Sequence, residues 1–159
     1  MKLLNTMPNT LEDAREEMKR ADHLLYVSLK YTRTVDVLKS LLERLTNAID
    51  AIIDGLLDFA LEKKKIKEKP ENLGLKGTLV KKTFKDETIN EMIDFSLTLK
   101  KINRAEFKRS REFRRHVTMT AITDTGIVEI NIDIIKEHYF KTKSYLDYAE
   151  EIIFGKKET

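Results

Sequence analysis

The sequence contains no cysteine, which excludes disulfide bonds and any chemistry that depends on a thiolate. It also lacks a long hydrophobic run. The apolar stretch at its start is too short for a signal peptide, and no later stretch approaches the roughly 18 apolar residues that cross a bilayer. We therefore expect a cytoplasmic protein with no membrane segment.

The chain is short of tryptophan, proline and glycine as well, with none, two and five of them. Of its 159 residues, 41% are hydrophobic, which is too many for a disordered chain. The charged fraction of 36% is well above the usual quarter. This length is that of one ordinary domain, which can bury a core without covalent staples, so residues 1–159 are predicted to form a single domain.

The net charge of +3 conceals two strongly basic blocks. Residues 63–85 carry nine basic and two acidic side chains, and residues 100–116 carry eight and two. The segment between them, 86–99, carries four acidic side chains and no basic one. Such segregation favours an anionic partner, although a lysine-rich stretch is also typical of a solvated loop or helix face.

Apolar residues at alternating three- and four-residue spacing predict a first helix that begins at Thr10 and a second from Val35 to about Glu62. Thr34 is a suitable cap for the second. A basic loop is expected over 63–77, followed by a short helix from Thr78 to Phe84. Asp86 is expected to cap the third long helix.

The remaining segments complete an all-α prediction. The third long helix is expected to continue as a polar extension to His116. Alternating residues around Asp124-Thr125-Gly126 then indicate a small β-hairpin or an extended excursion. The last helix is expected to run from about Asp133 to Ile153 and to stop at Gly155, with a frayed tail over 155–159. The predicted fold is an up-and-down helical bundle of four to five helices.

Two further patterns could bind ligands. Asp50, Asp54 and Asp58 recur at four-residue spacing in the second helix, which would suit a metal but is more typical of a solvated face. No Glu-x-x-His pair occurs, which excludes the ferritin-like di-iron pattern. We predict no metal and no cofactor. Four tyrosines, Tyr26, Tyr31, Tyr139 and Tyr145, could line a ligand pocket, although aromatic residues more often pack the core.

The candidate chemistry lies in the second basic block. His23 and His138 sit among apolar residues and are expected in the core or at its boundary. His116, in contrast, ends the most arginine-rich stretch of the chain. An imidazole can move protons near neutral pH, and a guanidinium clamps a phosphate. Metal-free RNA cleavage needs both groups, although a basic segment that only binds RNA would contain them too.

The stretch Arg111-Glu112-Phe113-Arg114-Arg115-His116 resembles the Arg-x4-His motif of the HEPN family (higher eukaryotes and prokaryotes nucleotide-binding domains). The helical pair before it and the segment 126–153 after it are similar to the first hairpin and the last helix of that family. The resemblance covers residues 10–153. Some phrases, such as YVSLKYTRTVDV, also resemble uncharacterised archaeal proteins.

This resemblance implies a homodimer in which two motifs face each other and form a metal-independent endoribonuclease site. Arg111 and His116 would be its catalytic residues. Where family members often have Asn, Asp or His after the arginine, this chain has Glu112, an auxiliary residue that could pair with Arg115 instead. The side chains expected to bind RNA or phosphate are Lys101, Arg104, Lys108, Arg109, Arg114 and Arg115.

Many HEPN proteins bind RNA without cleaving it, or are partners of nucleotidyltransferase antitoxins, so the fold does not decide the activity. Two hypotheses follow. The first is an RNA-binding protein, with or without ribonuclease activity. The second is a helical interaction module without catalysis, a homodimer or a toxin–antitoxin partner, whose arginines bind an acidic protein surface or a phosphate ligand.

Overall fold

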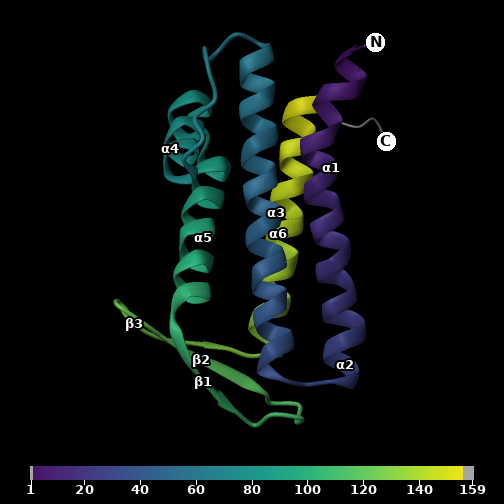
Figure 1. Ribbon diagram of the computed structural model, residues 1–159, viewed down its shortest axis with the longest axis vertical. Coiled ribbons are helices and arrows are strands. Elements are labelled where there is room, and N and C mark those ends of the chain that lie inside the picture. The colour runs from purple at the N-terminus through teal and green to yellow at the C-terminus, as the bar shows by residue number, and fades with distance from the viewer. Residues whose placement is uncertain (1, 156–159) are drawn as a thin grey trace.

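A computed structural model describes residues 2–155, with side chains from residue 11 onward. Long helices lie side by side, and a small sheet crosses one end of them (Figure 1). In chain order the elements are α1 (Lys2–His23), a π-helical turn (Leu24–Ser28), α2 (Leu29–Tyr31), α3 (Val35–Glu62), α4 (Leu73–Phe84), α5 (Glu87–Arg104), β1 (Glu106–Ser110), β2 (Thr118–Thr123), β3 (Gly126–Ile130) and α6 (Ile132–Phe154).

The all-α prediction is wrong, because a three-stranded antiparallel sheet in the order β1-β2-β3 accompanies the helices. The hairpin at 124–126 is confirmed as β2 and β3, with Thr123 opposite Gly126. Gly126 adopts a φ of 142°, which a residue with a side chain rarely tolerates. Strand β1 occupies the stretch expected to extend the third helix. That helix, α5, ends at Arg104, and Ala105 is already extended.

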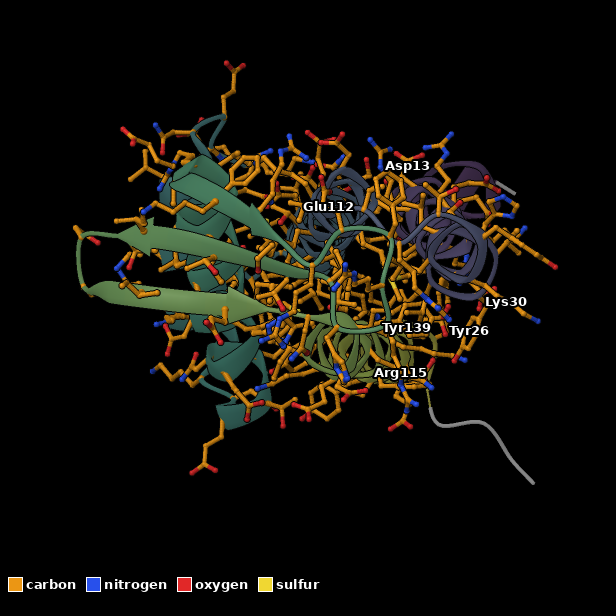
Figure 2. All side chains as sticks on the ribbon, turned by 90° about the horizontal axis from the view of Figure 1, so that it is seen from below. Asp13, Tyr26, Lys30, Glu112, Arg115 and Tyr139 are labelled. Atoms are coloured by element: carbon orange, nitrogen blue, oxygen red, sulfur yellow. The ribbon has the colours of Figure 1, made fainter. Side chains whose placement is uncertain are left out.

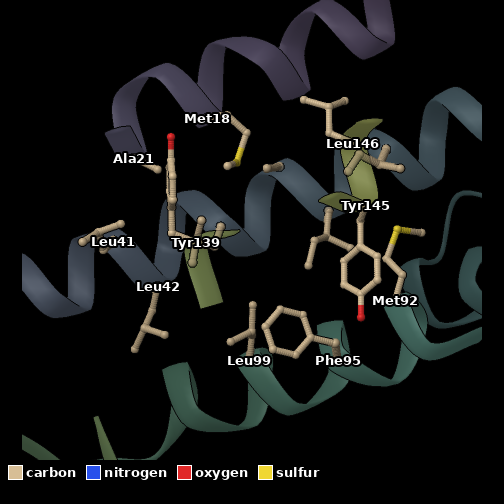
Figure 3. Packing of buried hydrophobic residues seen from close by; sticks show 14 of the residues in the cluster. Met18, Ala21, Leu41, Leu42, Met92, Phe95, Leu99, Tyr139, Tyr145 and Leu146 are labelled. Carbon is tan, nitrogen blue, oxygen red and sulfur yellow. The ribbon is translucent and has the colours of Figure 1, made fainter. Parts of the chain in front are cut away.

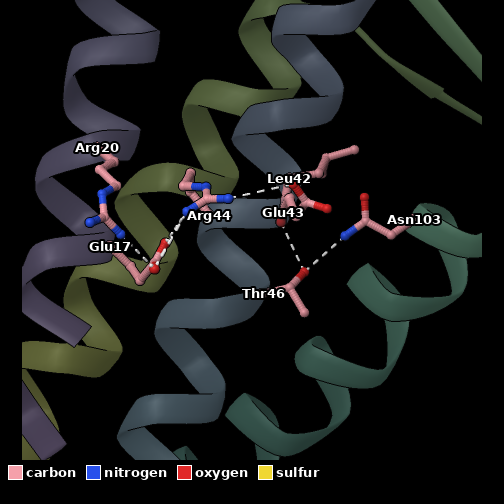
Figure 4. A network of polar contacts seen from close by, with 7 residues as sticks. All are labelled: Glu17, Arg20, Leu42, Glu43, Arg44, Thr46 and Asn103. Carbon is pink, nitrogen blue, oxygen red and sulfur yellow. Dashed lines mark hydrogen bonds and ion pairs between the residues drawn. The ribbon is translucent and has the colours of Figure 1, made fainter. Parts of the chain in front are cut away.

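The two helices predicted first in the chain, α1 and α3, pack against each other as an antiparallel pair. α1 begins at Lys2 rather than Thr10 and continues through the π-helical turn to α2. α3 spans the predicted range, and Thr34 Oγ1 accepts a hydrogen bond from Val37 N at 3.4 Å as its cap. Figure 4 shows a polar link between the two helices, in which Arg44 Nη1 of α3 donates to Glu17 Oε1 of α1 at 3.1 Å.

The segment between α3 and α5 differs from its prediction. The expected loop over 63–77 ends at residue 72, because α4 begins at Leu73 and includes Gly74 and Gly77. Asn72 caps this helix by accepting from Leu75 N at 3.1 Å. The predicted cap at Asp86 is confirmed, since its Oδ1 accepts from Ile89 N at 3.0 Å.

Helix α6 closes the core against α1, α3 and α5 (Figure 3). Tyr139 and Tyr145 are buried here and donate their hydroxyls to Asp22 of α1 and Glu91 of α5, at 2.8 and 2.5 Å. Burial raises the pKa of both hydroxyls above the ordinary value of 10.0, so the tyrosines stay neutral donors. α6 ends at Phe154, and Gly155 donates back to Glu151 as its cap. The rest of the predicted tail lies outside the described residues.

The other predictions for single helical residues have mixed outcomes. His138 is a boundary residue, as expected. Its ring contacts Phe95, and burial lowers its pKa below 6.5. His23 is exposed, contrary to expectation. Over residues 2–155 no helix combines the length and the apolar character that a bilayer crossing requires.

Candidate functional site

Residues 111–116, which we call the arginine loop, connect β1 to β2 at the sheet end of the bundle. The motif was expected at a helix end and lies instead in this turn between strands. In the view along the bundle axis, Glu112 lies toward α3 and Arg115 toward α6 (Figure 2). The loop thus runs across the end of the helices and presents its side chains away from the core.

Two hydrogen bonds fix the arginine loop to the start of α3. Phe113 N donates to Arg33 O at 2.6 Å, and Glu112 Oε2 accepts from Val35 N at 2.7 Å. Val35 is the first residue of α3, and its N–H has no partner inside the helix. A carboxylate there is also favoured by the positive end of the helix dipole. Glu112 therefore holds the loop in place instead of pairing with Arg115.

Replacing Glu112 by alanine is expected to lower the free energy of unfolding by about 1–2 kcal/mol, because Val35 N–H loses a charged acceptor in a partly buried position. Glu112→Gln keeps an acceptor oxygen and is expected to cost less than half as much. Urea unfolding of the two variants measures the difference. Equal losses in both would show that the Val35 hydrogen bond does not anchor the loop.

The backbone of the loop is strained at two positions. Arg111 and Phe113 have φ values of 53° and 67°, in the left-handed region that residues with side chains rarely adopt. Each such residue costs on the order of 1 kcal/mol and persists only when its surroundings hold it. Here the hydrogen bonds to Arg33 and Val35 hold the strained backbone in place. The shape of the loop is therefore imposed by α3.

Four exposed side chains of the loop have no partner in residues 11–155. They form no hydrogen bond, ion pair or ring contact there. Arg109, just before the loop, is different: it pairs with Asp36 at 2.9 Å and covers the ring of Phe107. The four side chains without a partner are Arg111, Arg114, Arg115 and His116.

The other predicted phosphate ligands lie apart from the loop. Lys101 pairs with Asp124, in the turn between β2 and β3, at 3.4 Å. Arg104 is the last residue of α5 and also lies toward that turn, at the far end of β1 from the loop. A five-residue strand such as β1 is about 17 Å long. Lys101 and Arg104 are therefore too far from the arginine loop to share one compact binding surface with it. Lys108 is exposed in mid-strand.

Arg33 belongs to the site and was missed from the sequence. It lies in the short connection between α2 and α3, and its carbonyl holds Phe113. Its Nε is buried and has no hydrogen-bond partner among the described side chains. No local sequence pattern indicates that Arg33 contacts the loop, because Arg33 and Phe113 are far apart in the sequence. They come together only when the β1–β2 connection folds against the start of α3.

The three evenly spaced aspartates of α3 are ion-paired to lysines. Lys100 lies 2.9 Å from Asp50, Lys76 lies 2.8 Å from Asp54, and Lys69 donates to Asp58 at 2.8 Å. Within residues 11–155 no cluster of three or more His, Asp or Glu side chains could hold a metal. These pairs also engage part of the first basic block, which lies at the opposite end of α3 from the arginine loop (Figure 1).

The predicted tyrosine pocket does not form. Tyr139 and Tyr145 are buried in the core, and Tyr26 stacks edge-on against Tyr139 with ring centres 6.2 Å apart. Tyr31 is 77% exposed. Two surface hollows of the described chain lie elsewhere. One is bounded by the segment 65–71 and helix α4, and another by side chains of α1 and α3.

Comparisons with protein-family models, with curated proteins and with solved structures find no match for this chain. The site is therefore defined by its own geometry: three arginines and a histidine without a partner in the described part of the chain, on a loop that α3 holds in a strained conformation.

Proposed function

We propose that this protein binds RNA through the arginine loop. The observation that carries the proposal is that Arg111, Arg114 and Arg115 are exposed and unpaired within the described chain, on a loop anchored by Glu112. A planar guanidinium fits two phosphate oxygens, and a fixed loop lowers the entropic cost of placing it. Such a surface matches the closely spaced phosphates of a nucleic acid strand.

The preference for RNA over other polyanions rests on the resemblance of residues 111–116 to the HEPN motif. In this proposal the protein is cytoplasmic, where it meets RNA. The lysines of the first basic block contribute less than expected, because Lys69, Lys76 and Lys81 are engaged by aspartates. The block also begins about 40 Å away, at the far end of the 28-residue α3.

Binding without cleavage is the form of the proposal that the geometry supports best. His116 is exposed, and within the described residues its imidazole has no partner that would orient it as a general base. Cleavage would require a second copy of the chain to complete the site with its own Arg111 and His116. Arg111 and His116 are the two ends of the loop, and both are exposed, so a second copy of the chain can reach them.

The test is incubation of purified protein with labelled RNA in the presence of EDTA. We expect RNA to be bound and to remain intact. Cleavage by the wild type that both Arg111→Ala and His116→Ala abolish would establish the catalytic form instead. Cleavage that both variants retain would point to a contaminating nuclease. If the wild type binds no RNA, the proposal is wrong.

The second candidate is a non-catalytic homodimer or partner of an antitoxin, favoured by one observation. Ile122 and Ile127 face each other across β2 and β3 and are 44% and 70% exposed, an apolar pair on the sheet. If this candidate is correct, Ile122→Ser together with Ile127→Ser weakens self-association, as measured by sedimentation, and neutralising Arg111 and Arg115 leaves the affinity for RNA unchanged.

A further inference from the structure

Phe113 occupies an unfavourable position for an aromatic residue. Its side chain is 75% exposed, so most of the free energy available from burying the ring is not gained. Its φ of 67° adds backbone strain that glycine or asparagine would reduce. Neither the packing of the fold nor its backbone geometry therefore accounts for a phenylalanine here.

The backbone that carries the ring is nevertheless held in place. The N–H of Phe113 donates to Arg33 O at 2.6 Å, and the preceding residue, Glu112, is bonded to Val35 N at 2.7 Å. The ring has no aromatic or cationic partner among residues 11–155. In the sequence it stands between Arg111 and Arg114, whose guanidinium groups are also free there.

We propose that Phe113 is a stacking platform for an unpaired base of the bound strand, so that the ligand is single-stranded RNA. This inference rests on the proposed function: the arginines hold phosphates, and Phe113 reads the exposed face of a base between them. Paired bases are stacked inside a duplex, and only an unpaired base can place its face on a protein ring. A single strand offers both phosphates for the cationic loop and a base for the exposed aromatic ring. An apolar protein surface offers no charged partner for the arginines, so it fits this site less well.

The absence of tryptophan from the chain provides a direct measurement. Phe113→Trp introduces a single indole, whose fluorescence a stacked base quenches. We expect a short oligoadenylate to quench it strongly, and a strand of the same length with abasic sugars to quench it little. Phe154→Trp is the matched control, because Phe154 is 52% exposed and lies at the end of α6 remote from the loop. Its fluorescence is expected to stay unchanged.

Affinities measured with labelled RNA complete the test. Phe113→Ala is expected to weaken binding of the oligoadenylate by about 5- to 150-fold, the usual range for one lost base stack. It should leave binding of the abasic strand and of duplex RNA unchanged. Because the side chain is exposed, this variant is expected to fold, which its urea unfolding curve checks.

Three results would overturn the inference. If Phe113→Trp binds oligoadenylate without quenching, the arginine loop binds RNA but Phe113 does not stack. If Phe113→Ala weakens single-stranded, abasic and duplex binding equally, the ring acts through the shape of the loop. If Phe113→Ala dissociates a dimer and leaves RNA affinity unchanged, the ring is a protein contact. The proposed function fails on a different result, the absence of any binding of labelled RNA by the wild type.

Discussion

Replacing Arg111, Arg114 and Arg115 together by glutamine is expected to reduce the affinity for single-stranded RNA about 100-fold at low salt. Each guanidinium is exposed and has no partner in residues 11–155, so each can contact a phosphate without breaking an internal ion pair. Three charged contacts worth about 1 kcal/mol each after solvent screening add up to that factor. Fluorescence anisotropy of a labelled oligoribonucleotide measures the change.

The matched control removes the same charge at the other end of the bundle. Lys67, Lys82 and Lys85 are exposed and lie in the first basic block, toward the end of α3 that is remote from the loop. Their replacement by glutamine is expected to reduce the affinity less than about 3-fold, since only long-range attraction is lost and salt screens it. Equal losses in the two triple variants would mean that RNA responds to net charge and not to the loop.

The second large effect concerns the core that supports the site. Leu42 is fully buried on α3, in the layer where α3 faces α5 and α6 (Figure 3). Leu42→Ala is expected to lower the free energy of unfolding by about 2–5 kcal/mol, because the lost methyl groups leave a cavity that the surrounding helices fill only in part. In a chain of this size each kcal/mol lowers Tm by about 2–4 °C.

Leu97→Ala is the control for this prediction. Leu97 belongs to α5 but is 56% exposed, so its truncation removes little buried surface. We expect its unfolding curve to lie within about 0.5 kcal/mol of the wild type. If Leu42→Ala were as mild as Leu97→Ala, α3 would not be the central packing element on which the arginine loop is anchored.

Long, strongly periodic helices could be predicted from the sequence because their signals are local. The bounds of α3, its cap at Thr34, the cap at Asp86 and the end of α6 at Gly155 all follow from neighbouring residues. The β2–β3 hairpin was predicted for the same reason, since Gly126 allows the backbone conformation that the turn needs.

Strand β1 could not be predicted in this way. Its sequence, Glu-Phe-Lys-Arg-Ser, contains one apolar residue, so neither period two nor a helical period stands out. Phe107 is half-buried and its strand neighbours are exposed, a pattern that depends on pairing with β2. The predicted start of α4 lies five residues late, because Gly74 and Gly77 are of a residue type that is common in loops. Gly77 is buried instead, with a side chain of Ile93 at 3.3 Å from where its Cβ would be.

The composition of the candidate site was predicted only in part. The arginine cluster is visible in the sequence, but its attachment depends on contacts across 77 residues between Glu112 and Val35. Arg33 was missed for that reason. Lys101 and Arg104 were included because they are close in sequence, whereas α5 and the sheet place them at the far end of β1.

The most direct test of the central claim is the salt dependence of RNA binding. For single strands, the logarithm of the affinity falls by about 0.7 per logarithm of salt for each phosphate contact. We predict that the slope of the wild type is steeper than that of the triple arginine variant by about 2, and that the triple lysine variant keeps the wild-type slope. A slope that the three arginine substitutions leave unchanged would contradict the assignment of RNA binding to this loop.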